Sequence, residues 1–406
     1  MSSSSSDDLI LVLNCGSSSI KFAVFDANVD PLPRTPLWNG KVQGIGGGQP
    51  DFGETGVTPF PIELDAEDPY RTALQVIRKQ VAARMGRHRI VAVAHRVVHG
   101  GSKYFASAVI DDDVLRDLRS YVPLAPLHQP FALEAIGILL RERPDILQVA
   151  CFDTAFHHTL PKVEQILPLP YAAWQHGLRR YGFHGLSYAY MATALAERHG
   201  DLARGRAVVA HLGSGASLCA MRGLQSVATT MGFSALDGLM MGTRTGALDP
   251  GAVLYLMEVE KLSLDQVAQL LYRQSGLLGV SGVSSEPRVL VQHEQDEGEA
   301  GERARIALAL YVRRIVREIG ALVAVLGGLD LLVFTAGVGE HSAPIRARIC
   351  ADLAYLGLRL DTNANAADAA VISGEDSDVM VGVEPTNEEW VAAVEARAAI
   401  SHRASP

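Results

Sequence analysis

A short Gly/Ser-rich turn that occurs twice constrains the fold of this chain more than any other feature. The first copy, Asn14–Lys21, and the second, within Ala207–Arg222, are each flanked on both sides by apolar runs. Apolar runs joined by a glycine and serine cluster predict a β-hairpin. Gly16 and Gly213 hold equivalent positions in the two turns, and nearly half of the 406 residues separate them. We therefore expect an internal duplication, in which each half offers a strand, a Gly-rich turn and a second strand.

The chemistry of these turns suits a phosphate group. Glycine allows backbone N–H groups to approach a ligand closely, and successive N–H groups with serine hydroxyls form a concavity for anionic oxygens. In the first copy Asn14 adds a neutral oxygen and Lys21 adds a positive charge. One such turn alone is better explained as an ordinary serine-rich surface hairpin. Its repetition favours a nucleotide cleft between two domains.

Composition and charge exclude several classes of protein. With 48% apolar and 20% charged residues, the chain has the composition of a soluble globular protein of two or three domains. The net charge of −9 argues against a nucleic-acid partner. The N-terminal residues lack the apolar core of a signal peptide, and the most hydrophobic window, Ala321–Val338, contains glycines and an aspartate, which argues against a membrane span. Four scattered cysteines without C-x-x-C spacing predict reduced thiols, so we expect a cytoplasmic protein with no membrane partner.

Two charged residues follow predicted core strands in the first half. Arg96 comes after the apolar run Ile90–His95 and before a Gly-Gly bend, and Asp153 follows the run Ile146–Phe152. Ligands of open α/β sheets bind outside the carboxyl ends of the strands, so both side chains are candidates for a ligand site. A plain surface charge is the alternative for Arg96.

Two further candidates lie in the second half. His184 belongs to a cationic, glycine-flanked segment just before a predicted helix. Arg244 is the one arginine of the Gly-rich stretch Met231–Gly246. A lone arginine in a flexible apolar loop has few structural partners, which is typical of a loop that presents a charge to a ligand.

A second phosphate signal lies near the end of the chain. The predicted strand Leu329–Thr335 leads into a Gly-x-Gly turn and a helix start at Ser342, where N–H groups at a helix N-terminus suit an anion. The chain has neither a P-loop nor a G-x-G-x-x-G motif after its first strand, which argues against P-loop kinases and dinucleotide enzymes as the first choice. Apolar spacing predicts further helices over Pro69–Met85, Asp112–Tyr121, Pro130–Arg141, Leu186–His199, Ala304–Leu326 and Trp390–Ile400.

Taken together, these motifs resemble those of the acetate kinase (acetokinase) family, within the actin/Hsp70/hexokinase-like superfamily. The resemblance covers the chain from Leu9 to about Arg397, and five motifs match in order: Asn14–Lys21, His95–Gly101, Phe152–His157, Tyr181–Gly185 with Met241–Gly246, and Thr335–His341. It implies an α/β fold of two duplicated actin/ribonuclease-H-like domains (βββαβαβα) with a nucleotide cleft between them. The first domain would comprise residues 1–153 plus a C-terminal helix in 387–406, and the second, carrying most of the nucleotide site, residues 154–386. A homodimer is also implied.

Carried over by position, the resemblance assigns roles to particular residues. Catalytic roles fall on Asp153, His184, Arg244 and Arg96. Substrate-binding roles fall on Arg96 for the carboxylate and on a wall for the acyl group formed by Val98, Leu127, Phe183 and Ala235. Nucleotide-binding roles fall on Lys21, His211, Leu212, Gly213, Ser214, Gly215, Glu286, Pro287, Arg288, Gly337, Val338, Gly339, Glu340 and His341. Metal-binding roles fall on Asn14 and Glu388, for Mg²⁺ or alternatively Mn²⁺.

The chain departs from the family pattern at four of these positions. Ser214 and His341 stand where asparagines are usual, and Glu286 stands where an aspartate is usual. These three residues keep hydrogen-bonding capacity or charge, so we interpret them as tuning nucleotide binding. Ala235 replaces a proline expected beside the acyl group and bears on substrate choice.

The function implied by the resemblance is reversible, in-line transfer of the γ-phosphoryl group of ATP to acetate. Acetate and ATP would be the small-molecule substrates, and acetyl phosphate and ADP the products. A propionate or other short-chain carboxylate kinase differs only in the acyl pocket and remains an alternative. An actin-like or Hsp70-like ATPase switch is a further alternative from another class, because a shared fold does not fix function. Against a switch stand the three cation-capable side chains Arg96, His184 and Arg244.

Overall fold

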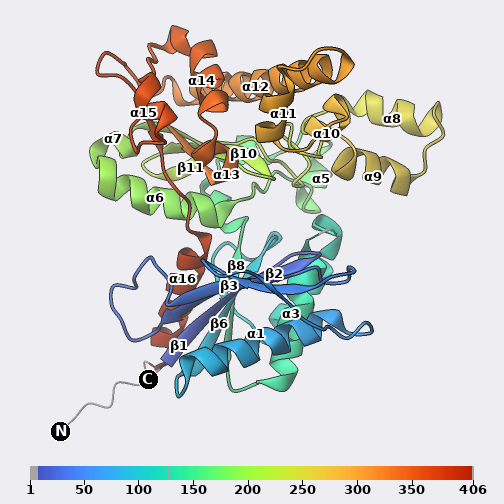
Figure 1. Cartoon of the computed structure of the whole chain (residues 1–406), viewed down its shortest axis with the longest axis vertical. Helices are drawn as coiled ribbons and strands as arrows, with labels where there is room; N and C mark the ends of the chain where they lie inside the picture. The colour runs from blue at the N-terminus through green and yellow to red at the C-terminus, as the bar shows by residue number, and fades with distance from the viewer. Residues whose placement is uncertain (1–7, 127, 405–406) are drawn as a thin grey trace. The chain divides into compact units, whose positions relative to one another are not determined.

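The computed structural model describes residues 8–126 and 128–404. The chain divides into two compact units (Figure 1). The first unit extends to Phe156 and includes the segment from Asn387 onward, and the second is His157–Thr386. The nucleotide cleft expected between two domains stays a prediction.

The first unit is built on one mixed sheet with the strand order β5-β4-β3-β2-β1-β6-β8-β7. Strands β1 to β4 form antiparallel neighbours, whereas β1, β6 and β8 run parallel. The strands are β1 (Asp8–Cys15), β2 (Ser19–Asp26), β3 (Trp38–Gln43), β4 (Asp51–Glu54), β5 (Phe60–Pro61), β6 (Arg89–Val97), β7 (Ala108–Val109) and β8 (Leu147–Phe152).

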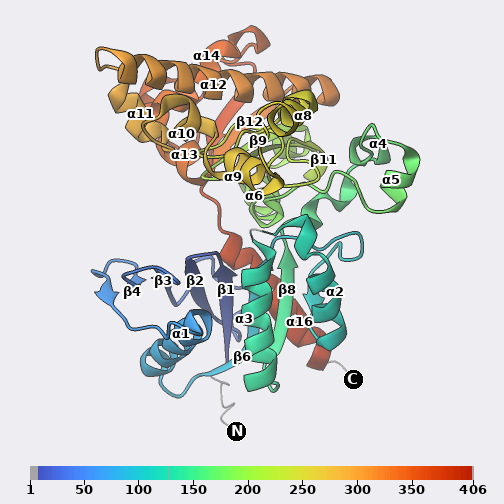
Figure 2. The same ribbon diagram turned by 90° about the vertical axis from the view of Figure 1, so that its right-hand side faces the viewer.

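Helices cover both faces of this sheet. Figures 1 and 2 show α1 (Pro69–Met85) and α3 (Gln129–Glu142) on one face and α16 (Glu388–Ala404) on the other. Helix α16 contacts β1, β6 and β8, so the C-terminal end of the chain completes the first unit. The remaining helical segments are α2 (Asp112–Ser120), η1 (Val122–Leu124) and η2 (Ala155–Thr159), the last of which spans the boundary between the units.

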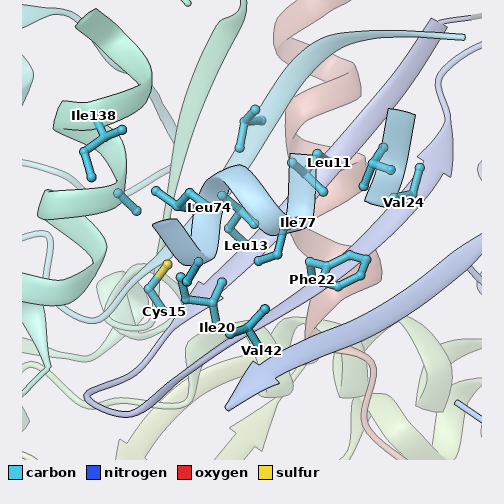
Figure 3. Packing of buried hydrophobic residues seen from close by; sticks show 14 of the residues in the cluster. Leu11, Leu13, Cys15, Ile20, Phe22, Val24, Val42, Leu74, Ile77 and Ile138 are labelled. Atoms are coloured by element: carbon cyan, nitrogen blue, oxygen red, sulfur yellow. The ribbon is translucent and has the colours of Figure 1, made fainter. Parts of the chain in front are cut away.

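The sequence explains α1 and the core beneath it. The Asp68 side chain accepts a hydrogen bond from the backbone N–H of Arg71, and Pro69 occupies the first helical position, where no N–H is needed. Buried side chains of α1 recur at helical spacing and pack on alternate residues of the strands. Figure 3 shows Leu74 and Ile77 of this helix against Leu11, Leu13, Cys15, Ile20, Phe22, Val24 and Val42.

The second unit has a five-stranded sheet with the order β11-β10-β9-β12-β13. Its strands are β9 (Arg206–Leu212), β10 (Ala216–Arg222), β11 (Gln225–Thr229), β12 (Leu331–Thr335) and β13 (Met380–Val383). Helix α12 contacts β9, β10 and β11, while α6 contacts β9, and Figure 1 shows these helices on opposite faces. The helical segments are α4 (Lys162–Gln165), α5 (Tyr171–Gln175), α6 (Gly185–His199), α7 (Asp201–Arg204), α8 (Pro250–Glu258), α9 (Leu264–Arg273), α10 (Gly276–Ser281), α11 (Pro287–His293), α12 (Glu299–Leu326), α13 (Ala336–His341), α14 (Ala343–Asp352), η3 (Ala354–Leu356) and α15 (Thr362–Ala366).

The strand order confirms the predicted internal duplication. In the first unit β3-β2-β1-β6-β8 are consecutive neighbours, and in the second β11-β10-β9-β12-β13 repeat this arrangement. In both, three sequential strands pair antiparallel and two later strands extend the sheet parallel to the first. The two predicted hairpins, β1–β2 and β9–β10, therefore occupy equivalent places.

Two local predictions need correction. Arg96 lies within β6 and not after it, since its backbone pairs with Cys151 of β8 and the strand continues to Val97. The Gly-x-Gly segment predicted as a turn is instead the short helix α13, which begins at Ala336 directly after β12, whereas the predicted helix start at Ser342 is confirmed by α14, whose N-cap residue is Ser342. Ala336 adopts a positive φ of 63°, which turns the chain from strand to helix without an intervening loop. In the described part of the chain, no helix combines the length and apolarity needed to cross a membrane.

Candidate active site

The carboxyl ends of three neighbouring strands gather polar residues in the first unit. Asn14 lies near the end of β1, Arg96 near the end of β6, and Asp153 directly after β8. Leu13 and Cys15 belong to the core under α1, so Asn14 faces the opposite side of the sheet, where α16 packs. Arg96 faces that side too, because Val93 and Val97 point into the core.

Arg96 lies between two carboxylates. Its Nε donates to both oxygens of Asp153 at 3.1 Å, and its Nη2 donates to Asp153 Oδ2 at 2.8 Å. Its Nη1 lies 2.9 Å from Oε2 of Glu388, the first residue of α16. The three side chains are 21%, 3% and 14% exposed, so this is a largely buried cluster. Burial alone would lower the pKa of Arg96, but the carboxylates of Asp153 and Glu388 together raise it above its ordinary value.

In the second unit, two histidines stack at the start of α6. The rings of His184 and His211 are 4.1 Å apart and nearly parallel, at 17°. His184 Nδ1 lies 2.8 Å from the hydroxyl of Ser217, and His211 Nδ1 lies 2.9 Å from the hydroxyl of Ser187. His184 has a φ of 58°, a left-handed conformation that is uncommon for residues other than glycine. Such strain is found where the surrounding structure fixes a side chain for function.

His184 and Arg244 meet beside the Gly-rich turn of the second hairpin. A Cβ atom built on Gly215 would lie 3.1 Å from His184 Nε2 and 3.8 Å from Arg244 Nη1. Arg244 Nη1 also donates to the Ala235 carbonyl at 3.0 Å, and burial lowers the pKa of Arg244. Because residue 215 is glycine, the space that a side chain would fill remains empty, and His184 Nε2 and Arg244 Nη1 both lie next to that space.

Four segments that are far apart in sequence line one pocket of about 520 Å³ in the second unit, among them Gly242 and Thr243 next to Arg244. This volume is in the range of small-molecule sites. From the turn come Gly213 and Ser214, and the other predicted residues on the lining are Glu286, Pro287, Arg288, Gly337, Val338 and His341. The predicted residues His211, Leu212, Gly215, Gly339 and Glu340 do not line it, although all belong to the same segments. Gly213 joins this pocket to the His184–Arg244 pair through a turn of three residues, closed by a hydrogen bond of 3.0 Å between Gly213 N and Gly215 O.

Other predicted residues lie apart from these groups. Lys21 pairs with Asn14 across the first hairpin and lines a different pocket, of about 410 Å³, together with Lys41 and Glu389. Of the predicted acyl wall, Val98 is partly buried in the first unit, whereas Phe183 and Ala235 belong to the second. The predicted wall residue Leu127 lies outside the described residues.

Sequence reasoning missed the residues that hold this machinery in place. Arg346 is fully buried, and its guanidinium donates to the carbonyls of Gly339 and Glu340, which fixes the short helix α13 at the pocket. Ser217 and Tyr188 are also fully buried, and their hydroxyls lie 2.5 Å apart next to His184. Ser217 lies just after the second Gly-rich turn, and this position was the sequence signal that could have identified it as part of the site. Nothing in the local sequence distinguishes Arg346 from a surface arginine of an amphipathic helix.

Two sheets with one repeated strand order, a pocket lined by part of a Gly-rich turn, and a histidine and an arginine that meet beside that turn define a phosphotransferase of the actin-like fold class. Comparison with known proteins specifies the family. The model of the acetokinase family matches residues 9–394. The chain is 47% identical over 392 residues to an acetate kinase of Rhodopseudomonas palustris (strain TIE-1), which covers 95% of this chain and 97% of the relative.

Solved structures agree with this result. A crystal structure of Porphyromonas gingivalis acetate kinase matches with a TM-score of 0.86 and 36% identity, over 97% of this chain and 100% of that one. A propionate kinase from Francisella tularensis matches with a TM-score of 0.88 and 33% identity, over 96% and 99% of the two chains. The chain belongs to the acetokinase family, and its activity is that of an acetate-kinase-type carboxylate phosphotransferase. Its substrates are small molecules, and the family uses ATP or ADP with a divalent metal.

Proposed function

We propose that this enzyme transfers the γ-phosphoryl group of ATP directly and in line to the carboxylate of acetate, reversibly, giving acetyl phosphate and ADP. The observation that carries the proposal is the approach of His184 Nε2 and Arg244 Nη1 to one point beside Gly215, in the same turn as Gly213 and Ser214, which line the pocket. A nucleotide in this pocket would direct its phosphates toward the turn. The ATPase-switch alternative does not account for family membership over nearly the whole chain.

His184 and Arg244 stabilise the transferring phosphoryl group in this proposal. Phosphoryl transfer passes through a loose transition state whose charge is spread over equatorial oxygens, so catalysis depends on positioning and electrostatics. Burial of Arg244 strengthens its interaction with those oxygens, because less water competes for them. The Ala235 carbonyl fixes one Nη of the guanidinium, which reduces the reorganisation needed during the reaction.

Arg96 binds the acyl carboxylate, and Asp153 orients Arg96. In support, Nε and Nη2 of the Arg96 guanidinium donate to the Asp153 carboxylate, whereas Nη1 contacts a different carboxylate, that of Glu388. A substrate carboxylate has the same chemistry as the Glu388 carboxylate and would bind the same donor. Since a carboxylate nucleophile is already ionised at neutral pH, no general base is required.

The oxygen donors near Arg96 fit a hard divalent cation, and we infer that it is Mg²⁺ or Mn²⁺. Asp153 and Glu388 place two negative charges against one guanidinium, and Asn14 adds a neutral amide oxygen on the same face of the sheet. Carboxylate and amide oxygens with water are the ligands that Mg²⁺ prefers. Asn14 and Glu388 would hold the ion, which would neutralise phosphate charge when bound. Among the described residues, no group of three or more His, Cys, Asp and Glu side chains is placed to hold a metal, so water and phosphate oxygens would supply the other ligands.

The acyl pocket decides between acetate and propionate. Ala235 stands where a proline is expected, and its carbonyl contacts Arg244, so the missing ring atoms lie near the proposed site of transfer. One added methylene in an apolar pocket changes specificity by about 1–3 kcal/mol, or roughly 10–200-fold. We expect propionate to be a good substrate, within about tenfold of acetate in kcat/KM, and Ala235→Pro to shift the ratio toward acetate. An unchanged ratio would show that residue 235 does not shape the pocket.

We also propose a homodimer and a cytoplasmic location. Helix α8 has no buried residue, and Leu254, Tyr255 and Val259 on or next to it are 53–58% exposed. Leu264, on α9, is 71% exposed. An apolar surface of this kind is typical of an interface. Sedimentation at micromolar concentration should give twice the mass of the chain, and a monomer would contradict the dimer. The cytoplasmic location follows from the need for ATP.

The activity is tested by trapping the acyl phosphate with hydroxylamine. The protein with ATP, MgCl₂ and acetate, or propionate in a parallel reaction, should give the acyl hydroxamate at a rate proportional to enzyme concentration. The matched control is the Arg244→Ala variant, which should lose about 10²–10³ in rate. ATP hydrolysis without hydroxamate would contradict transfer to a carboxylate and favour a simple ATPase.

A further inference from the structure

A fully buried serine links the proposed catalytic histidine to a fully buried tyrosine. The Ser217 hydroxyl lies 2.8 Å from His184 Nδ1 and 2.5 Å from the Tyr188 hydroxyl. Ser217 is on β10, just after the turn that ends at Gly215, while both ring-bearing residues are on or next to α6. Ser217 and Tyr188 have no exposed surface, so water does not compete with these two hydrogen bonds.

The direction of these hydrogen bonds follows from the chemistry of the three groups. A phenol hydroxyl is more acidic than an aliphatic one, and its oxygen is the poorer acceptor, so Tyr188 donates to Ser217. Burial raises the pKa of Tyr188 well above its ordinary value, so the phenol keeps its proton. The single proton of Ser217 is then directed to His184 Nδ1, which must accept it. The imidazole proton is therefore on Nε2.

We propose that Tyr188 and Ser217 are positioning residues that hold His184 in the tautomer with its proton on Nε2, so that this atom donates to the transferring phosphoryl group. The inference rests on the proposed role of His184. Nε2 is the atom that approaches the open point at Gly215, which it shares with Arg244. The opposite tautomer would direct a lone pair at the anionic phosphoryl oxygens and repel them.

A second set of contacts fixes the plane of the His184 ring. His211 stacks on this ring, and its own Nδ1 lies 2.9 Å from the Ser187 hydroxyl, to which Thr386 Oγ1 donates at 2.9 Å. The stacking limits rotation of the His184 ring about its axis, but it does not choose a tautomer. That choice depends on the hydrogen bond from Ser217.

Kinetics of single and double variants test the proposal. Ser217→Ala removes the donor to Nδ1 and should lower kcat about tenfold to a hundredfold, less than the full loss of a transition-state donor, with KM for ATP changed less than about twofold. Tyr188→Phe keeps the Ser217 hydroxyl but removes the hydrogen bond that directs the Ser217 proton toward His184, so the effect of this variant on kcat should be smaller. Tyr311→Phe removes a hydroxyl from another buried tyrosine, on α12, and serves as the matched control with unchanged kcat.

The His184→Ala background separates positioning from a general structural role. If Ser217 acts through His184, adding Ser217→Ala to His184→Ala should change kcat by less than about twofold, because the group that it positions is already gone. A further loss equal to that seen in the wild-type background would overturn the proposal. Near-native kcat in His184→Ala itself would refute the proposed function of His184 and, with it, the catalytic consequence of the tautomer.

The tautomer can be observed without any assay of activity. In protein labelled with ¹⁵N-histidine, the His184 signals are assigned by their loss in His184→Gln. We expect a pyridine-type Nδ1 and a pyrrole-type Nε2 in the wild type, and a mixture of tautomers in Ser217→Ala. A pyrrole-type Nδ1 in the wild type would overturn the proposal whatever the role of His184 in catalysis.

Discussion

Removing Arg96 should cost stability as well as activity. In Arg96→Ala the carboxylates of Asp153 and Glu388, only 3% and 14% exposed, lose their shared counter-charge. Breaking a buried ion pair by removal of one partner costs about 3–5 kcal/mol, because the remaining charge stays desolvated. For a unit of this size, that loss lowers Tm by roughly 6–20 °C. A loss of about 10²–10³ in kcat/KM for acetate should accompany it.

A triple variant separates the two effects. Arg96→Ala combined with Asp153→Asn and Glu388→Gln removes the uncompensated charges, so most of the stability should return, whereas activity should not. The matched control is Arg71→Ala, which breaks the exposed pair with Glu142 in the same unit. An exposed pair contributes only about 0–1 kcal/mol.

Tryptophan fluorescence during urea unfolding measures these changes. Trp38 and Trp390 belong to the first unit and Trp174 to the second, so a Trp174→Phe background reports on the first unit alone. If Arg96→Ala unfolds within about 1 kcal/mol of the wild type, the two carboxylates are not held by Arg96 as we argue, and the electrostatic reasoning is refuted. Recovery of activity in the triple variant would equally refute a role for Arg96 in binding substrate.

Two further predictions concern the second unit and pH. Gly215→Ala should lower kcat by about 10²-fold, because its methyl would lie 3.1 Å from His184 Nε2. Gly337→Ala is the matched control: its methyl borders the pocket but meets no atom within 4 Å, so it should change only KM for ATP. Equal effects of the two variants on kcat would contradict the proposed site. Burial lowers the pKa of His95, His99 and His157 to about 4, from an ordinary value of 6.5. The unfolded chain therefore binds protons first as the pH falls, so stability is full above about pH 6.5 and declines toward pH 4, by up to about 1.4 kcal/mol per pH unit for each histidine. Urea midpoints that do not fall between pH 7 and pH 5 would contradict this.

The sequence by itself determined the elements and the family. Periodic apolar residues predicted α1 with its observed bounds, and the repeated turn predicted two equivalent hairpins. Both predictions succeeded because each depends only on residues that are close together in the sequence. Asp153 was correctly predicted to follow a core strand, for the same reason. The turn predicted over the Gly-x-Gly segment was wrong, because a positive φ at Ala336 turns the chain directly from β12 into helix α13.

Only the tertiary structure decided which side chains meet. Arg96 is bound on one side by Asp153, 57 residues away, and on the other by Glu388 near the end of the chain, and no spacing in the sequence encodes that pairing. Likewise, Ser217 reaches both His184 and Tyr188 because β10 lies beside the start of α6. Hydrogen bonds and ion pairs act over about 3 Å, so they depend on how distant segments pack, whereas strand and helix patterns depend on neighbours along the chain.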